Sequence, residues 1–224
     1  MAKAFVISLG GSLFALPAGL DKQYINHFIE FIKAQAAAGQ RMYIVVGGGQ
    51  VGRDYIKAAP EASRDDQDWI GIMSTRLNAE LLRAKLGRWA RPEVVIDPGQ
   101  KMSSRQPVVI IAGYKPGWST DYVAVMIAKA NGIKRIINLT NVDYVYSADP
   151  KKEKSARPLS AITWEDFKRL VGGKWQPGLN SPFDPIASKL AASEKMRVDI
   201  LNGRNLKNLE SCLSGHDFKG TRIG

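Results

Sequence analysis

The chain has 224 residues, 45% of them hydrophobic and 24% charged, so it can bury a sizeable core, and we expect a single domain over residues 1–224. The formal net charge is +11, but the excess of basic residues is scattered, which does not favour nucleic acid as the main partner. No apolar run approaches the length of a membrane span, and the lone Cys212 excludes an internal disulfide, so we expect a soluble, cytoplasmic protein.

Short apolar runs alternate with segments of helical periodicity along the chain. Strands are predicted at residues 4–9, 43–46, 94–96, 108–112, 135–139 and 198–201. Helices are predicted at residues 24–38, 51–56, 69–86, 123–130, 164–171, 186–192 and 206–213. Runs such as Ile44-Val45-Val46 are apolar on both faces, which is typical of parallel strands that are covered on both sides. The sequence therefore predicts an α/β fold with a largely parallel sheet between helices.

The segment from Tyr43 to Ile56 joins a buried strand, a run of three glycines and a helix. Glycine has no Cβ, so its N–H group can approach an oxyanion closely, and a helix N-terminus adds further donors and a partial positive charge. Arg53 follows one turn into the helix, where its planar guanidinium can grip phosphate oxygens. This segment predicts a phosphate-binding site.

Three further turns follow predicted strands, at residues 10–12, 113–120 and 140–141. The carboxyl ends of parallel strands lie at one edge of a sheet, where ligands of open α/β sheets bind. We therefore expect these turns and the glycines at residues 47–49 to share one edge.

Other chemistries receive less support. Gly47, Gly49 and Gly52 fit the G-x-G-x-x-G pattern of dinucleotide-dependent oxidoreductases, but the acidic residue at the expected spacing, Asp68, opens a helix instead of ending a strand. The chain lacks the G-x-x-x-x-G-K-[ST] motif of P-loop proteins. Its two histidines are far apart in sequence, and no Cys/His cluster has metal-ligand spacing.

The stretch from Tyr114 to Asp121 carries a second candidate site. Pro116-Gly117 predicts a tight turn, after which Ser119 or Thr120 can cap the next helix. A capped helix alone would explain these residues. In the functional interpretation, their hydroxyl and N–H groups reach a ligand, and Asp121 orients a lysine or holds Mg²⁺.

These motifs occur in the same order in the archaeal type of uridylate (UMP) kinases, a branch of the amino-acid kinase family, which the chain resembles over nearly its whole length. The motifs are Gly47 to Ile56, Ile70-Gly-Ile-Met-Ser-Thr-Arg-Leu-Asn-Ala79, Pro116-Gly-x-Ser-Thr-Asp121, Thr140-Asn-Val-Asp-x-Val-Tyr-x-Ala-Asp-Pro-Lys-Lys152 and Asp184-Pro-Ile-Ala-Ser-Lys189. The resemblance implies an αβα sandwich, transfer of the γ-phosphoryl group of ATP to UMP in pyrimidine nucleotide biosynthesis, Mg²⁺ as cofactor and a homohexamer.

The resemblance also implies roles for individual residues. Those that would bind ATP are Ser8, Leu9, Gly10, Gly11, Ser12, Gly49, Arg53, Thr140, Asn141, Tyr146 and Asp149. Those that would bind UMP are Gly48, Asp68, Tyr114, Lys115, Pro116, Gly117, Trp118, Ser119 and Thr120. Because phosphoryl transfer requires positioning and charge neutralisation more than a protein nucleophile, the catalytic candidates are Lys189, Asp121 and Arg53.

The chain departs from the family pattern at three places. Tyr144 stands where glycine is usual, Ala112-Gly113-Tyr114 replaces Gly-Gly-Thr, and Ser8 occupies a position that is lysine in the bacterial type. Two alternatives to UMP kinase therefore stay open. One is a kinase of the same fold that acts on another small acceptor, and the other is a non-catalytic protein that binds nucleotides or oxyanions.

Overall fold

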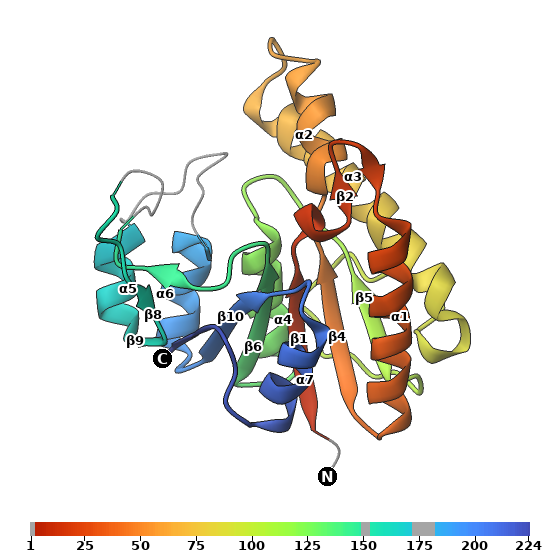
Figure 1. Ribbon diagram of the computed structural model, residues 1–224. Helices are drawn as coiled ribbons and strands as arrows, with labels where there is room; N and C mark the ends of the chain where they lie inside the picture. Colours follow the sequence, from red (N-terminus) through yellow and green to blue (C-terminus); the bar gives the residue numbers. More distant parts are fainter. Residues whose placement is uncertain (1–2, 149–152, 172–181) are drawn as a thin grey trace.

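A computed structural model describes residues 3–148, 153–171 and 182–224. Its centre is a seven-stranded sheet in the order β5-β4-β1-β6-β10-β11-β9 (Figure 1). All neighbouring strands run parallel except β10 and β11. The strands are β1 (Ala4–Leu9), β4 (Arg41–Val46), β5 (Val108–Ile111), β6 (Arg135–Thr140), β9 (Ala161–Ile162), β10 (Arg197–Asn202) and β11 (Thr221–Ile223).

Helices cover both faces of this sheet. They are α1 (Lys22–Ala37), α2 (Gly49–Lys57), α3 (Arg64–Leu86), α4 (Thr120–Ala130), α5 (Trp164–Val171), α6 (Pro185–Ser193) and α7 (Leu206–Ser214). Single turns of 3₁₀-helix occur at η1 (Gly11–Leu13) and η2 (Gly87–Trp89). Two hairpins lie outside the main sheet: β2 (Ala15–Leu16) pairs with β3 (Gly19–Leu20), and β7 (Val145–Tyr146) pairs with β8 (Pro158–Leu159).

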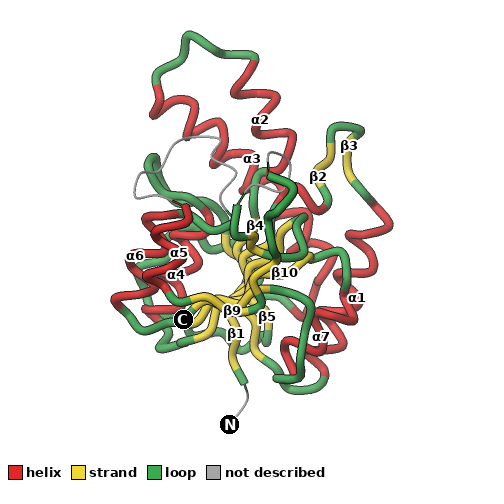
Figure 2. Tube along the Cα trace, turned by 60° about the vertical axis from the view of Figure 1, so that its left-hand side comes forward, coloured by secondary structure: helices red, strands yellow, loops and turns green. Residues whose placement is uncertain are grey.

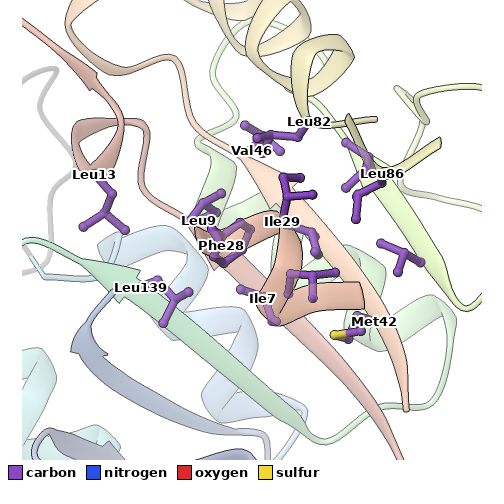
Figure 3. Packing of buried hydrophobic residues seen from close by; sticks show 14 of the residues in the cluster. Ile7, Leu9, Leu13, Phe28, Ile29, Met42, Val46, Leu82, Leu86 and Leu139 are labelled. Atoms are coloured by element: carbon purple, nitrogen blue, oxygen red, sulfur yellow. The ribbon is translucent and has the colours of Figure 1, made fainter. Parts of the chain in front are cut away.

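Alternate residues of each strand enter two separate cores, because successive side chains of a strand point to opposite faces. Ile44 packs in the core under α1, α3 and α7, part of which is shown in Figure 3. Its neighbour Val45 packs in the second core with α4, α5 and α6. Both side chains are fully buried. The predicted αβα sandwich around a largely parallel sheet is therefore confirmed.

Residues 94–96 were predicted to form a strand, and this prediction is wrong. Val95 makes only an isolated bridge to Ile111, through two backbone hydrogen bonds of 2.9 Å. Pro92 and Pro98 bracket the segment, and proline has no N–H group to extend a ladder. Strands β9 and β11 were not predicted, since they have only two and three residues, too few for a periodic pattern to be recognised.

The strand order creates a topological switch point between β1 and β6. From β1 the chain turns back through α1 to β4 on one side, whereas β6 lies on the other side of β1 and pairs onward with β10. Helix α2 and the first turns of α3 project beyond the carboxyl edge of the sheet (Figures 1 and 2). Ligands of open α/β sheets bind at such switch points. None of the helices in the described part of the chain is long and apolar enough to cross a membrane.

Candidate active site

The turns after β1, β4 and β6 meet at the carboxyl edge of the sheet. The N–H of Gly10 donates to the carbonyl oxygen of Leu139 at 2.9 Å, and the N–H of Gly47 donates to the carbonyl oxygen of Leu9 at 2.9 Å. Thr140 ends β6, beside Gly10. The structure thus brings together the segments that were predicted to hold the phosphates and the adenosine of ATP.

Glycine is required where the first two turns face each other. A Cβ on Gly11 would lie 2.2 Å from the backbone N of Gly49, and a Cβ on Gly47 would lie 2.7 Å from the backbone N of Gly11. Gly49 also has a φ of +69°, which side chains rarely allow. Gly48 caps α2 without any side-chain hydrogen bond, so the first N–H groups of this helix can receive an anion.

Helix α3 holds the β4 turn from behind. The buried side chain of Asn78 donates through Nδ2 to the carbonyl oxygens of Gly47 and Gly48, at 2.9 and 3.0 Å. A Cβ on Gly48 would lie 2.2 Å from Oγ of Ser74. The position of Gly48, predicted to bind UMP, is therefore fixed by two polar side chains of α3.

The same helix also positions the loop after β5. Thr75 Oγ1 accepts a hydrogen bond from the N–H of Gly113 at 2.7 Å. One to two turns earlier on α3, Asp68 Oδ2 accepts from the N–H of Gly117, also at 2.7 Å. Gly117 has a φ of +79°, as a tight turn requires. The predicted acceptor loop and Asp68 are thus in direct contact.

Aromatic side chains organise the rest of the acceptor loop. The Trp118 ring packs edge-on against both Tyr114 and Tyr122, with centroids 5.3 and 4.5 Å apart. Lys115 Nζ lies 5.0 Å from the Trp118 ring centroid, within reach of a cation–π interaction. Ser119, and not Thr120, caps α4 by accepting from the N–H of Tyr122. Pro116 precedes the Gly117 turn and is partly buried.

Below the turns, Asp121 links three elements. Its Oδ1 accepts from the Ser8 hydroxyl at 2.9 Å, and its Oδ2 accepts from the N–H of Asp184 at 3.1 Å. Asp184 itself caps α6. Burial raises the pKa of the Asp121 carboxyl to about 6, although these two hydrogen bonds act in the opposite direction. Asp121 therefore positions β1, α4 and α6 relative to one another.

Two of the catalytic candidates lie apart from this cluster. Arg53 is exposed on α2, where its Nε and a terminal nitrogen donate to Gln50 Oε1 at 3.0 and 2.9 Å. Lys189 is exposed on α6, and its side chain lines a small cavity between α5 and α6 with Trp164 and Lys168. To meet a phosphate, Arg53 would have to leave its contact with Gln50, and the role of Lys189 stays a prediction.

The remaining ATP candidates extend from β6. Asn141 is exposed next to Thr140, and Tyr146 is partly buried. The Tyr146 ring packs edge-on against Tyr144, with centroids 6.4 Å apart, so the tyrosine that replaces a glycine is part of an aromatic pair. Leu9 is buried and Ser12 lies in η1. Asp149 lies outside the described residues.

Sequence reasoning did not assign Ser74, Thr75 and Asn78 to the site. A signal was available, since these three polar residues occupy the buried face of α3. Buried polar groups are hydrogen-bonded as a rule. A helix that buries three of them near the carboxyl edge of the sheet is therefore expected to bind backbone turns there.

The fold and this edge define a class: an αβα sandwich whose glycine turns meet at the switch point, where phosphate-bearing ligands bind. The model of the amino acid kinase family matches residues 3–202. The chain belongs to the amino acid kinase family.

Relatives from archaea match nearly the full length. The uridylate kinase of Methanospirillum hungatei is 35% identical over 223 residues, which are 97% of this chain and 93% of that protein. The uridylate kinase of Pyrobaculum neutrophilum is 34% identical and covers 98% of this chain and 99% of its own. The crystal structure of uridylate kinase from Archaeoglobus fulgidus superposes with a TM-score of 0.84 at 33% identity, over 98% of this chain and 99% of that one.

The raised pKa of Asp121 predicts a pH-dependent effect of Asp121→Asn on stability. The folded state binds the proton more tightly than the unfolded state, so the stability contributed by Asp121 is present at pH 4 and lost as the pH rises through about 6. Between pH 4 and pH 7 the variant should therefore gain about 2 kcal/mol relative to the wild type, as an order of magnitude. Urea unfolding at both pH values measures this difference, and a difference that does not change with pH would contradict it.

Proposed function

We propose that the protein transfers the γ-phosphoryl group of ATP to UMP, giving ADP and UDP in pyrimidine nucleotide biosynthesis. One observation carries the proposal: the Gly10-Gly11 and Gly47-Gly48-Gly49 turns meet backbone to backbone at the switch point, at the uncapped start of α2. This occurs in a chain whose near-full-length archaeal relatives are uridylate kinases. Such an activity belongs in the cytoplasm, and cell fractionation that finds the protein elsewhere would count against it.

In the proposed complex, ATP lies over β1 and β6. Residues 8–12, together with Gly49, surround its phosphates, while Thr140, Asn141 and Tyr146 hold the adenosine. UMP lies over β4 and β5, with Gly48 against its phosphate, Asp68 on the ribose hydroxyls, and residues 114–120 around the uracil. The two nucleotides then meet with their phosphates end to end between the facing turns.

The chemistry requires positioning and charge neutralisation. Fixed N–H groups of the turns that meet the developing charge without reorganisation would stabilise the transition state, as preorganised donors do. Arg53 and Lys189 would turn in from α2 and α6 to meet the charge on the transferring group. Asp121 touches Ser8 and Asp184 through both oxygens, so its proposed role is to position β1.

Mg²⁺ is proposed to arrive with ATP. Among the described residues, no group of three or more His, Cys, Asp or Glu could hold a metal ion. This fits Mg²⁺, which usually keeps several waters and is bound through substrate phosphates and one or two carboxylates. Asp121 and Asp184, which are hydrogen-bonded to each other, are two candidate carboxylates. When bound, Mg²⁺ neutralises phosphate charge.

The oxidoreductase alternative loses support from the fold. The acidic residue of a dinucleotide site ends a second strand. Here Asp68 lies inside α3 and contacts Gly117, so it points toward the acceptor loop.

A substrate panel tests the proposed activity. ADP release from ATP and Mg²⁺ should depend on UMP, and CMP, AMP, GMP or isopentenyl phosphate should give at most about a tenth of its kcat/KM. Arg53→Ala should lower kcat/KM for UMP about tenfold or more, because a charge-assisted phosphate contact is worth ~1.5–3 kcal/mol. The control, Lys57→Ala, removes an exposed charge from the last turn of the same helix.

Each outcome of the panel distinguishes the alternatives. Turnover with another acceptor in place of UMP would indicate a sibling kinase. Nucleotide binding without turnover on any acceptor would indicate a non-catalytic binding protein. Wild-type kinetics for Arg53→Ala would remove this residue from the site.

Asp68 is expected to act on the UMP KM. Asp68→Ala removes both the proposed ribose contact and the acceptor for the Gly117 N–H, so the KM should rise about tenfold or more. Asp68→Asn keeps an oxygen that can accept from the Gly117 N–H but loses the charge. Its KM for UMP should therefore lie between those of the wild type and Asp68→Ala. Asp65→Asn on the same helix is the exposed control. Full recovery of the wild-type KM in Asp68→Asn would reduce Asp68 to a residue that only holds the loop.

We also propose that the protein assembles with copies of itself, into the hexamer expected from the resemblance. Helix α3 exposes three large apolar side chains four residues apart, which places them on one face. These are Trp69, Met73 and Leu77, which are 40, 52 and 67% exposed. Contiguous apolar surface of this kind marks an interface, and a symmetric dimer would pair the same face of two copies.

Leu77→Glu should reduce the assembly. A charge on this face would be buried without a partner in the oligomer, so light scattering should show a lower mass than for the wild type. Ile96→Glu, which changes an exposed apolar side chain elsewhere, should leave the mass unchanged. A wild-type protein that is monomeric, or a Leu77→Glu variant of unaltered mass, would contradict the proposal.

A further inference from the structure

A basic hollow lies at the amino ends of three central strands, at the opposite end of the sheet from the glycine turns. Its volume is about 640 Å³, within the range of small-molecule sites. In Figure 1 this end of the sheet lies near the N label, where β1 begins. The hollow is lined by Ala4, Asn131, Gly132, Ile133, Lys134, Arg135, Lys195 and Arg197.

Cations outnumber carboxylates around this basic hollow. Two carboxylates form ion pairs with the lining residues, and each of them contacts more than one cation. Asp199 is fully buried and contacts Arg135, Arg197 and Arg222, at 2.7, 3.2 and 3.3 Å. Glu194 contacts Lys129 at 2.7 Å and, at 3.8 Å, Lys134. Four cations line the hollow, Lys134, Arg135, Lys195 and Arg197, and two carboxylates contact them, which leaves an excess of two positive charges.

Two lining residues carry further signs of a ligand. Nε of Arg197 is buried and has no hydrogen-bond partner among the described residues, which is uncommon for a buried donor. Lys195 is the one residue other than glycine with a positive φ, 51°, in the described chain. Glycine is usual at this position after a helix, so the backbone accepts strain while an exposed cation is presented.

This basic hollow is separate from the candidate active site. Ala4, Arg135 and Arg197 begin strands that end at Leu9, Thr140 and Asn202. Each strand has six residues and rises about 3.3 Å per residue, so the two ends are roughly 17 Å apart. A ligand of the glycine turns cannot reach the hollow.

We propose that the basic hollow binds an oligophosphate, a small ligand with several adjacent phosphate groups. Arginine forks bind phosphate oxygens in pairs, and lysines add point charges without fixed geometry. A linear chain of phosphates carries several adjacent negative charges, which complement the four lining cations.

Calorimetric titration with inorganic triphosphate, at about 0.1 M salt to screen distant charges, tests this proposal. Lys195→Gln/Arg197→Gln should weaken the binding about tenfold or more. The matched control, Lys57→Gln/Lys85→Gln, removes two exposed lysines of α2 and α3, and its affinity should stay within about twofold of the wild type. The titration measures binding and not catalysis, so its result is independent of the outcome of the kinase assay.

Arg197 contacts the buried Asp199, so its replacement could destabilise the fold. Two further variants control for this effect. Lys134→Gln/Lys195→Gln leaves every contact of Asp199 in place and should also weaken binding. Arg197→Lys keeps the charge and should bind more tightly than Arg197→Gln. Equal losses in the hollow variants and the control pair, or no loss in either, would overturn the proposal. A DNA duplex that competes more strongly than triphosphate would instead assign the hollow to nucleic acid.

Discussion

The rest of the structure depends on two backbone turns that leave no room for a side chain between them. Gly11 and Gly49 approach so closely that a Cβ on Gly11 would overlap the backbone of Gly49. Side chains normally keep two backbone segments apart, so their absence lets these two turns approach backbone to backbone. The parallel pairing of β1 with β4 sets this approach, because it fixes the register of the two strands up to Leu9 and Val46.

Helix α3 turns this local approach into a rigid site. It reaches the β4 turn through Asn78, the start of the β5 loop through Thr75 and the end of that loop through Asp68. These contacts span more than two helical turns of one continuous element. Donors held on a rigid helix lose little freedom when a ligand binds, and the site is therefore largely formed before the ligand arrives.

Much of this could be predicted from the sequence, and the limits have a physical origin. Apolar runs such as Ile44-Val45-Val46 identified a doubly covered sheet, since burial on both faces is a local property of the residues. The glycine turns were also identified, since a run of glycines after a strand is a local feature of the sequence. Contacts such as Asn78 to Gly47 join residues 31 apart and depend on the packing of α3, so the polar residues on its buried face indicate a contact without identifying the partner. Residues 94–96 had the composition of a strand, but their flanking prolines limited the pairing.

The turns at the carboxyl edge of the sheet contain few basic residues, although the protein as a whole has many. Lys115 is the one lysine or arginine in residues 10–12, 47–49, 113–120 and 140–141, and it lies over aromatic rings. The Ser8 hydroxyl donates to Asp121, so it is already engaged within the protein. The turns themselves therefore offer neutral N–H dipoles, which need no counter-charge. In the proposed complex, full charges come from exposed side chains such as Arg53, which cost little desolvation before a phosphate binds.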